Sequence, residues 1–475
     1  MKKYKFLWIM IALLTLLQPL ITTANAQDLD FADASVRNGC NTIDGQSPVY
    51  GTGKLLEAAT SAMLYEVNSG TLLYSWNADQ QVYPAGLVKI MTALIVLENA
   101  DITEVVTVSN TAVASISELY ATLKLIPGEQ FTVDQMLYAI LVGSANDAAA
   151  VLAEHIAGSE EAFVQMMNKR ALELGCTGTY FTNVHGLHSD EQFTTARDMV
   201  KITAEAMKHP YFMEYFSTMS YRIAATEFSP IRRVEATNLM MSYTSELYYD
   251  ARVTGGRTGI TSDKSRSIVI TAESKGFNFI IVVLAAQPSY KPGTSVITRF
   301  GSYEEAKELL KLGFEQNKLF QVLYEGQSLA SYNVNGGDSL VSLGPTDTIS
   351  VVLPKDVTFE DMDVRFGVSN GSFSAPIEKG TELTDVQIWL GDVCVAQSPV
   401  VSLNKVAYAG SAKMVPNSKS SIDFMNVVRL IALVILVIAA IMLIIYFILR
   451  SVGLWRRVKL MILHRRRRTG RRRSR

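Results

Sequence analysis

Apolar residues in the first half of the chain form short runs that predict β-hairpins. Ser61–Glu66 and Thr71–Trp76 are apolar, strand-like runs, and Asn68-Ser69-Gly70 between them suits the positive backbone angles of a tight turn. Ser267–Thr271 and Phe277–Leu284 are β-branched runs that repeat the pattern. We therefore predict two hairpins far apart in the sequence.

Other stretches show the helical period, with apolar residues at i, i+3 and i+4. These stretches are Pro84–Leu97, Val133–Ile156, Glu160–Leu174 and Tyr303–Phe314. Gly143-Ser144 interrupts the second stretch, which predicts two helices there. Mixed α and β elements thus fill residues 53–316, which predicts an α/β domain.

From Leu319 to Val406 the helical period is absent and the apolar runs are short. Val322–Tyr324, Ser350–Leu353 and Val386–Leu390 read as strands separated by turn residues. We predict a separate, small all-β domain over 317–406, followed by a Ser-, Ala-, Gly- and Asn-rich linker over 407–426.

Both ends of the chain carry targeting signals. Residues 1–26 combine three lysines, a short apolar run and Ala24-Asn25-Ala26, a pattern typical of a secretory signal peptide; an uncleaved anchor is the alternative. Residues 27–52 are polar and predict a spacer. The export signal predicts that the chain following Ala26 leaves the cytoplasm.

A second apolar stretch lies near the C-terminus. Leu430–Leu449 is twenty residues without a charge, so we predict a transmembrane helix over 427–449, with a buried core helix as the weaker alternative. Residues 450–475 hold twelve Lys or Arg residues and no acid. By the positive-inside rule this tail is cytoplasmic and residues 27–426 are extracytoplasmic, in a single-pass protein of the cell membrane.

Charge separates the tail from the body. The whole chain has a net charge of −1, but segment 27–449 contains 29 basic and 45 acidic residues and so has a net charge of −16. An acidic body argues against nucleic-acid binding, and we expect no nucleic-acid partner. The basic tail fits a topology determinant, with anionic lipid as a candidate partner.

The three cysteines, Cys40, Cys176 and Cys394, are far apart and none belongs to a Cys-x-x-Cys pair. They predict no disulfide framework, and without His at metal spacing nearby they predict no metal site. We expect no cofactor.

Three short segments of the α/β domain carry candidate chemistry. They are Pro84-Ala-Gly86-Leu-Val-Lys89, Gly143-Ser144-Ala-Asn146 and Arg257-Thr258-Gly259. In order and spacing they resemble the three signatures of penicillin-binding proteins and class A β-lactamases, Ser-x-x-Lys, Ser-Asp-Asn and Lys-Thr-Gly. The closer resemblance is to low-molecular-mass, serine-type D-alanyl-D-alanine carboxypeptidases, and it extends through Leu125-Ile-Pro-Gly-Glu129 and His185-Gly-Leu187.

The resemblance implies a fold and a ligand. The fold is a β-lactamase-like domain, an antiparallel sheet flanked by helices, over residues 53–316, followed by the small all-β domain and one C-terminal transmembrane helix. The implied ligand is a peptidoglycan stem peptide ending in D-Ala-D-Ala.

The most important departure from the family pattern falls on the nucleophile. Gly86 stands where the family has its nucleophilic serine, and glycine has no side chain that could attack a carbonyl. Loss of a covalent nucleophile can reduce a rate by about a millionfold. On sequence alone, Gly86→Ser is expected to regain penicillin labelling and to gain some helix propensity.

The remaining positions keep roles that the resemblance implies. Lys89 would take or hold a proton one helical turn from position 86, and Ser144 would assist in the shuttle. Asn146 would bind the substrate amide, while Arg257, in place of the family's lysine, would bind the terminal carboxylate beside Thr258 and Gly259.

Two functions follow for the chain. The first is a membrane-anchored family member that binds stem peptides without covalent catalysis. The alternative is an active carboxypeptidase that removes the terminal D-Ala with a substitute nucleophile such as Ser144, or with activated water. A receptor that signals through the arginine-rich tail is a third class, supported by charge alone.

Overall fold

The computed structural model describes Val49 and residues 57–409, apart from residues 115, 118, 262 and 368–372. The predicted signal peptide (1–26), membrane helix (427–449) and basic tail (450–475) lie outside the described residues, as do the linker from residue 410 and nearly all of the spacer. Within the described part of the chain, no helix is both long and apolar enough to cross a membrane.

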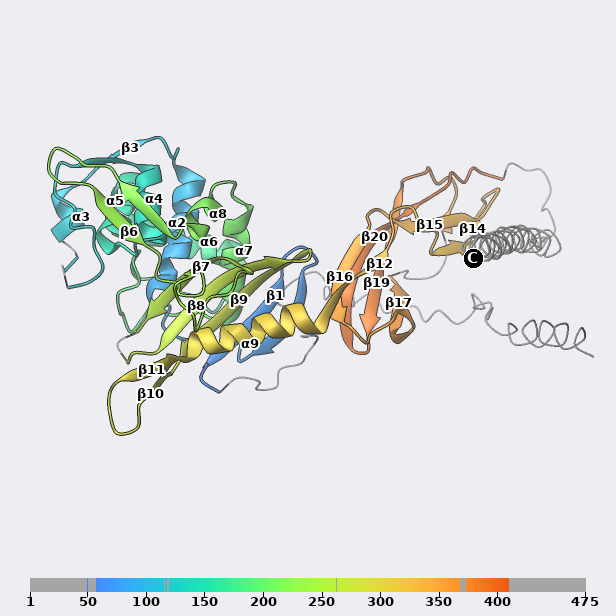
Figure 1. Ribbon diagram of the computed structural model, residues 1–475. Helices are drawn as coiled ribbons and strands as arrows, with labels where there is room; N and C mark the ends of the chain where they lie inside the picture. The colour runs from blue at the N-terminus through green and yellow to red at the C-terminus, as the bar shows by residue number, and fades with distance from the viewer. Residues whose placement is uncertain are drawn as a thin grey trace, which may run out of the picture. The chain divides into compact units, whose positions relative to one another are not determined.

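A five-stranded antiparallel sheet forms the centre of the α/β domain, with strand order β2-β1-β9-β8-β7 (Figure 1). Its strands are β1 (Ser61–Glu66), β2 (Thr71–Trp76), β7 (Val253–Ile260), β8 (Arg266–Ser274) and β9 (Phe277–Ala286). Both predicted hairpins are confirmed as β1–β2 and β8–β9. The sheet places β7, which carries the third motif, at its edge.

The sheet is buried on both faces. In β9, Ile280 and Val282 pack into one core with the helices around α2, while Phe279 and Ile281 pack into a second core with α9 (Gly301–Gln316). A strand with apolar residues on both faces reads as a continuous apolar run, which is why β9 was recognisable from sequence. The helix α9 is amphipathic because its apolar side packs on this second face of the sheet.

The helical half covers the first face of the sheet. Its elements are η2 (Ala85–Leu87), α2 (Val88–Asn99), α3 (Asn110–Ala114), α4 (Val133–Leu141), α5 (Asn146–Ala157), α6 (Glu160–Glu173), α7 (Ala196–Lys208) and α8 (Phe212–Ser217). Every residue of α2 from Val88 to Leu97 is buried. The break at Gly143-Ser144 separates α4 from α5 as predicted, and the first helical run begins with a 3-10 turn. A charged residue within α2 is therefore enclosed by protein.

Three two-stranded ribbons complete the domain: β3 (Val105–Thr107) with β4 (Gln130–Thr132), β5 (Ser220–Ile223) with β6 (Arg232–Glu235), and β10 (Pro288–Tyr290) with β11 (Ile297–Phe300). The sequence patterns did not predict them, because short, largely exposed strands leave little apolar periodicity.

The C-terminal region is all-β apart from one short turn. Its elements are β12 (Asn317–Leu323), β13 (Ala330–Tyr332), β14 (Val334–Asn335), β15 (Val341–Pro345), β16 (Ile349–Pro354), η3 (Phe359–Asp361), β17 (Met362–Phe366), β18 (Phe373–Ser374), β19 (Glu382–Leu390) and β20 (Val393–Ser402). A five-stranded sheet, β13-β15-β20-β19-β17, holds a core of its own that includes Val341, Val386 and Val400. The predicted β domain is confirmed.

The cysteines correct one prediction. Cys394 in β20 is disulfide-bonded, whereas Cys176 is a buried thiol outside any disulfide; Cys40 lies outside the described residues. The prediction of no disulfide framework did not anticipate this bond. Wide spacing in the sequence gave no sign of it, because a fold can bring distant cysteines together.

Candidate functional site

The first motif lies where η2 passes into α2. Gly86 is the middle residue of η2, and the residue before it, Ala85, adopts a left-handed backbone with φ of 47°. Such a conformation costs a non-glycine residue of order 1–3 kcal/mol and usually persists only where the surrounding structure imposes it. The turn aims Lys89, in the first turn of α2, into the domain interior.

Lys89 is almost fully buried, and its amine contacts two uncharged oxygens. Its Nζ donates to Asn146 Oδ1 at 2.6 Å and to the backbone carbonyl oxygen of His185. Burial, followed by repulsion from Arg257, holds the pKa of Lys89 well below its usual range, although Asp147 opposes the shift. A neutral amine is thus favoured at the floor of the site.

The second motif connects α4 to α5. Ser144 has a left-handed backbone with φ of 61°, and Asn146 is the first residue of α5. The strained turn directs the Asn146 side chain to Lys89 and places the Ser144 hydroxyl beside Arg257. The structure therefore brings the first and second motifs together, as the sequence predicts.

Arg257 in β7 links the sheet edge to the helical half. Its Nε donates to the Gly86 carbonyl oxygen at 3.3 Å, its Nη1 to the Leu141 carbonyl oxygen at 3.1 Å, and its Nη2 to Ser144 Oγ. The side chain is 1% exposed, and burial lowers the pKa of Arg257 to about 10. All three of these acceptors are uncharged.

The rest of the third motif also lies against η2. Thr258 Oγ1 is 2.7 Å from Thr237 Oγ1, just after β6. A Cβ built on Gly259 would lie 2.9 Å from the Pro84 carbonyl oxygen and 3.1 Å from the Gly86 nitrogen. Glycine at 259 is therefore needed for this close approach of strand and turn.

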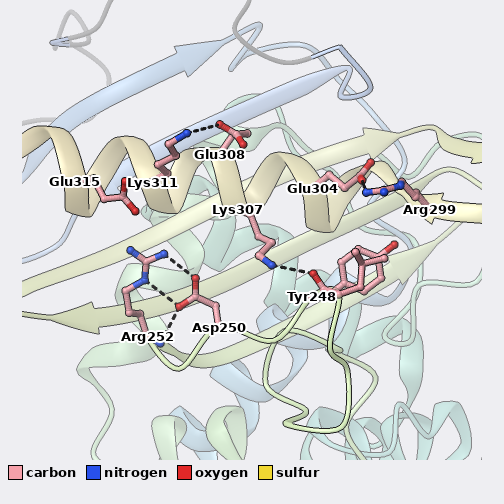
Figure 2. A pocket seen from close by; sticks show the side chains of 10 residues that line it. Tyr248, Asp250, Arg252, Arg299, Glu304, Lys307, Glu308, Lys311 and Glu315 are labelled. Carbon is pink, nitrogen blue, oxygen red and sulfur yellow. Dashed lines mark hydrogen bonds and ion pairs between the residues drawn. The ribbon is translucent and has the colours of Figure 1, made fainter.

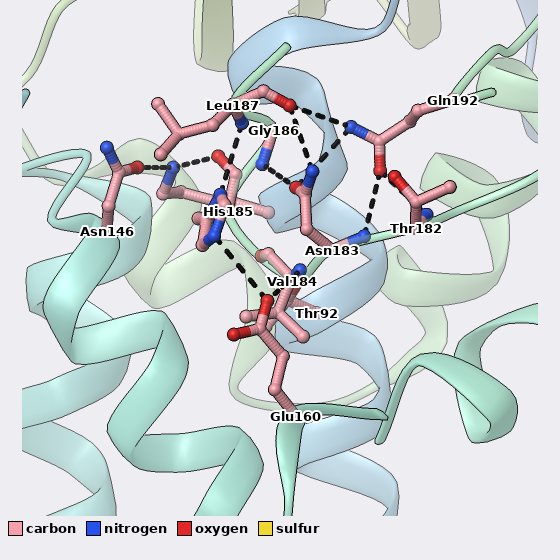
Figure 3. Close-up of polar contacts among 11 residues, drawn as sticks. Thr92, Asn146, Glu160, Thr182, Asn183, Val184, His185, Gly186, Leu187 and Gln192 are labelled. Carbon is pink, nitrogen blue, oxygen red and sulfur yellow. Dashed lines mark hydrogen bonds and ion pairs between the residues drawn. The ribbon is translucent and has the colours of Figure 1, made fainter. Parts of the chain in front are cut away.

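The loop at 183–192 reaches the site through the backbone carbonyl oxygen of His185, which accepts a hydrogen bond from Lys89 (Figure 3). Besides its carbonyl contact with Lys89, His185 accepts the Leu187 N–H through Nδ1 at 3.1 Å, so Nε2 bears the ring proton and points to Glu160 Oε1 at 3.5 Å. Burial and the nearby Lys89 lower the pKa of His185 to about 3, and the ring is neutral. Burial also raises the pKa of Glu160.

Sequence reasoning assigned no role to Glu160 or to the carbonyl oxygens of Leu141 and His185. Backbone acceptors leave no trace in a sequence, and Glu160 in the first turn of α6 reads as an ordinary helix-terminal acid. Only His185-Gly-Leu187, through its resemblance to the family loop, signalled that this segment belongs to the site.

A cavity of about 270 Å³ opens beside η2. Ala85, the loop residues 186–189 and the end of β7 at Ile260 and Thr261 line it, together with Tyr83 and Tyr120. The lining contains backbone and uncharged polar groups suited to a peptide. The residues that line this cavity do not include Lys89, Ser144, Asn146 or Arg257.

A larger cavity, of about 410 Å³, lies against α9 and is unrelated to the motifs (Figure 2). Its charged groups largely pair with one another: Arg252 with Asp250 and Arg299 with Glu304, each at 2.7 Å. It is a solvated ionic surface rather than a prepared site. In the described ranges, no group of three or more His, Cys, Asp or Glu residues is placed to hold a metal ion.

The fold is that of the penicillin-binding proteins. Penicillin-binding protein 5 from Haemophilus influenzae superposes with a TM-score of 0.63 at 27% identity, covering 75% of this chain and 100% of that one. The D-alanyl-D-alanine carboxypeptidase DacD from Francisella tularensis shares the fold at 19% identity, with a TM-score of 0.57 over 79% of this chain and 100% of that one.

Sequence comparison adds the family. Residues 52–288 match the D-alanyl-D-alanine carboxypeptidase family model, and residues 314–408 match the C-terminal domain of penicillin-binding protein 5. Similar proteins include D-alanyl-D-alanine carboxypeptidase DacF of Bacillus subtilis, 28% identical over 76% of this chain and 88% of the relative, and DacC of Escherichia coli, 29% identical over 74% and 85%. Residues 52–288 thus form a domain of the D-alanyl-D-alanine carboxypeptidase family, which belongs to peptidoglycan metabolism.

Proposed function

We propose that this protein is a non-catalytic member of its family that binds stem peptides ending in D-Ala-D-Ala. The observation that carries the proposal is Gly86 in η2, at the position where the first motif calls for the serine nucleophile. Glycine leaves the first motif without an attacking atom.

The surroundings of Lys89 support the absence of covalent chemistry. A general base activates a nucleophile by accepting a proton from it within hydrogen-bond reach. The acceptors of the Lys89 amine, an amide oxygen and a carbonyl oxygen, carry no proton to give. The amine holds Asn146 and the His185 loop in place instead.

Peptide binding is supported by the cavity beside η2. An extended peptide could lie between the end of β7 and loop 186–189, with its terminal carboxylate directed to Arg257. The guanidinium would then exchange a neutral acceptor for the carboxylate. Charge-assisted hydrogen bonds are roughly twice as strong as neutral ones, which favours this exchange.

Calorimetric titration tests binding. Diacetyl-Lys-D-Ala-D-Ala should bind roughly ten- to a hundredfold more tightly than its C-terminal amide. Arg257→Ala should remove that preference, whereas the control Arg299→Ala, at an exposed ion pair, should keep it. Equal affinity of the parent protein for acid and amide would contradict the proposal.

Ser144 supports a second candidate, an active carboxypeptidase with a substitute nucleophile. Its hydroxyl accepts a hydrogen bond from the cationic Arg257, and a nearby positive charge favours the alkoxide. Release of D-Ala from the peptide by the parent protein, abolished by Ser144→Ala, would establish this alternative.

We also propose that residues 27–426 are extracytoplasmic, anchored by one C-terminal helix with the basic tail inside the cell and able to contact anionic lipid. The charge bias on either side of Leu430–Leu449 supports this orientation. Protease added outside intact cells should remove both folded domains. Digestion of the tail with protection of the body would reverse the orientation.

A further inference from the structure

The approach of β7 to η2 is closer than a side chain at residue 86 allows. A Cβ built on Gly86 would lie 2.8 Å from the Thr258 carbonyl oxygen and 3.7 Å from the Gly259 Cα. The obstacle is backbone, so it cannot rotate away as a flexible side chain could. A serine or alanine at this position needs the strand and the turn to separate by several tenths of an ångström.

Arg257 opposes that separation. Its guanidinium joins β7 to three segments of the helical half through the Gly86 and Leu141 carbonyls and the Ser144 hydroxyl. The planar fork of an arginine can reach several acceptors at once, whereas a lysine amine is a single point at the end of a shorter chain.

The opposite side of η2 is also fixed. Gly186 has φ of 82°, and a Cβ built on it would lie 1.9 Å from the Ala85 carbonyl oxygen. The turn is thus held between loop 186–189 and the sheet edge. It cannot move away from β7 without pushing this loop, which Asn183 holds through a hydrogen bond from the Gly186 N–H at 2.7 Å.

We propose that Gly86 and Arg257 form a latch that holds β7 against η2, and that the two residues depend on each other. Glycine permits the close approach, and the arginine holds the strand there. This latch goes beyond the proposed peptide binding and does not depend on it, because it concerns the ligand-free fold.

A double-mutant cycle tests the latch in the full-length protein, with the urea midpoint of unfolding as the readout. Gly86→Ser should lower the midpoint in the Arg257 chain, and Gly86→Ala, which adds Cβ without a hydroxyl, should lower it similarly. In the Arg257→Lys background, Gly86→Ser should lower the urea midpoint by at most half as much as it does in the Arg257 chain. Equal losses in both backgrounds would overturn the latch.

Hydrogen exchange provides a second readout that needs no substitution at Gly86. Arg257→Lys should accelerate exchange of backbone amides in η2 and the first turn of α2 by about tenfold or more, since the turn is released. Arg299→Lys, at the exposed pair with Glu304, is the matched control and should leave these amides unchanged. Unaltered exchange in Arg257→Lys would also overturn the latch.

Discussion

The Nζ atom of Lys89 and the Oδ1 atom of Asn146 lie 2.6 Å apart, and both side chains are buried. This contact joins the first turn of α2 to the first turn of α5. It makes the buried amine part of the packing between two helices.

Lys89 should make stability depend on pH. Its pKa in the fold is lowered from 10.5, so between the lowered value and 10.5 the unfolded chain holds a proton that the folded chain lacks. Stability contributed by this group is therefore lost as pH falls through that window and regained as pH rises. Lys89→Met should reduce the gain in unfolding free energy as the pH rises toward 10.5.

Urea unfolding at several pH values measures this difference. Lys208→Met is the control, because the Lys208 side chain is 74% exposed and pairs with Glu205 at the surface. If the unfolding free energy of Lys89→Met rises with pH as much as that of the parent, Lys89 remains protonated in the fold.

His185 should produce the corresponding effect in acid. Its pKa is 6.5 ordinarily and about 3 in the fold, so acidification through this interval protonates the unfolded chain first and destabilises the native state. The fully developed effect is of order 5 kcal/mol. His185→Asn, which keeps an acceptor for the Leu187 N–H, should be less sensitive to acid than the parent.

Circular dichroism at falling pH measures the acid unfolding of His185→Asn and of the parent protein. His188→Asn, at an exposed ring, should follow the parent. Parallel acid unfolding of His185→Asn and the parent would show that the His185 ring is charged or solvated in the fold.

Two substitutions of Ser144 test the backbone strain in the turn between α4 and α5. Ser144→Ala removes the acceptor of Arg257 Nη2 and should destabilise the protein by about 1–3 kcal/mol. Ser144→Gly removes the same acceptor but suits φ of 61°, so it should be more stable than Ser144→Ala by about 1 kcal/mol. Chemical denaturation orders the variants, and equal stability of the two would argue against backbone strain.

Gly86→Ala separates local propensity from tertiary packing. Alanine gains about 1 kcal/mol over glycine within a helix, whereas overpacking typically costs about 1–3 kcal/mol. With Cβ only 2.8 Å from the Thr258 carbonyl oxygen, packing should prevail and stability should fall.

The control for Gly86→Ala is Gly367→Ala, where the nearest atom to a new Cβ is 3.5 Å away. It should change the unfolding free energy by about 0.5 kcal/mol or less. A gain in stability for Gly86→Ala would mean that the turn adapts and that the sequence-based expectation for Gly86→Ser was right.

Sequence periodicity predicted the elements whose apolar residues make most of their contacts with the core. The β1–β2 hairpin and α9 follow from apolar runs, and the break between α4 and α5 from Gly143-Ser144. By contrast, β7 contains Gly255, Gly256 and Gly259, a composition unfavourable for a strand, and only its motif marked it.

The candidate site shows the same limit. The resemblance to the family motifs implied that Lys89, Ser144, Asn146 and Arg257 lie together. The structure joins Lys89 to Asn146 and Ser144 to Arg257 by hydrogen bonds. The resemblance gave no indication that the Arg257 guanidinium is enclosed by backbone carbonyls or that Gly86 faces the Thr258 carbonyl. These relations depend on the approach of chain segments far apart in the sequence, which the residue pattern does not encode locally.

Intact-protein mass after incubation with penicillin tests the central claim most directly. The parent chain should show no added mass, because Gly86 supplies no nucleophile and the Ser144 hydroxyl is bonded to Arg257 rather than to Lys89. Gly86→Ser with Arg257→Lys, which gives positions 86 and 257 the residues of the family motifs, serves as the positive control and should gain the mass of one β-lactam. A stoichiometric adduct on the parent chain would contradict the account and identify a functioning nucleophile in this site.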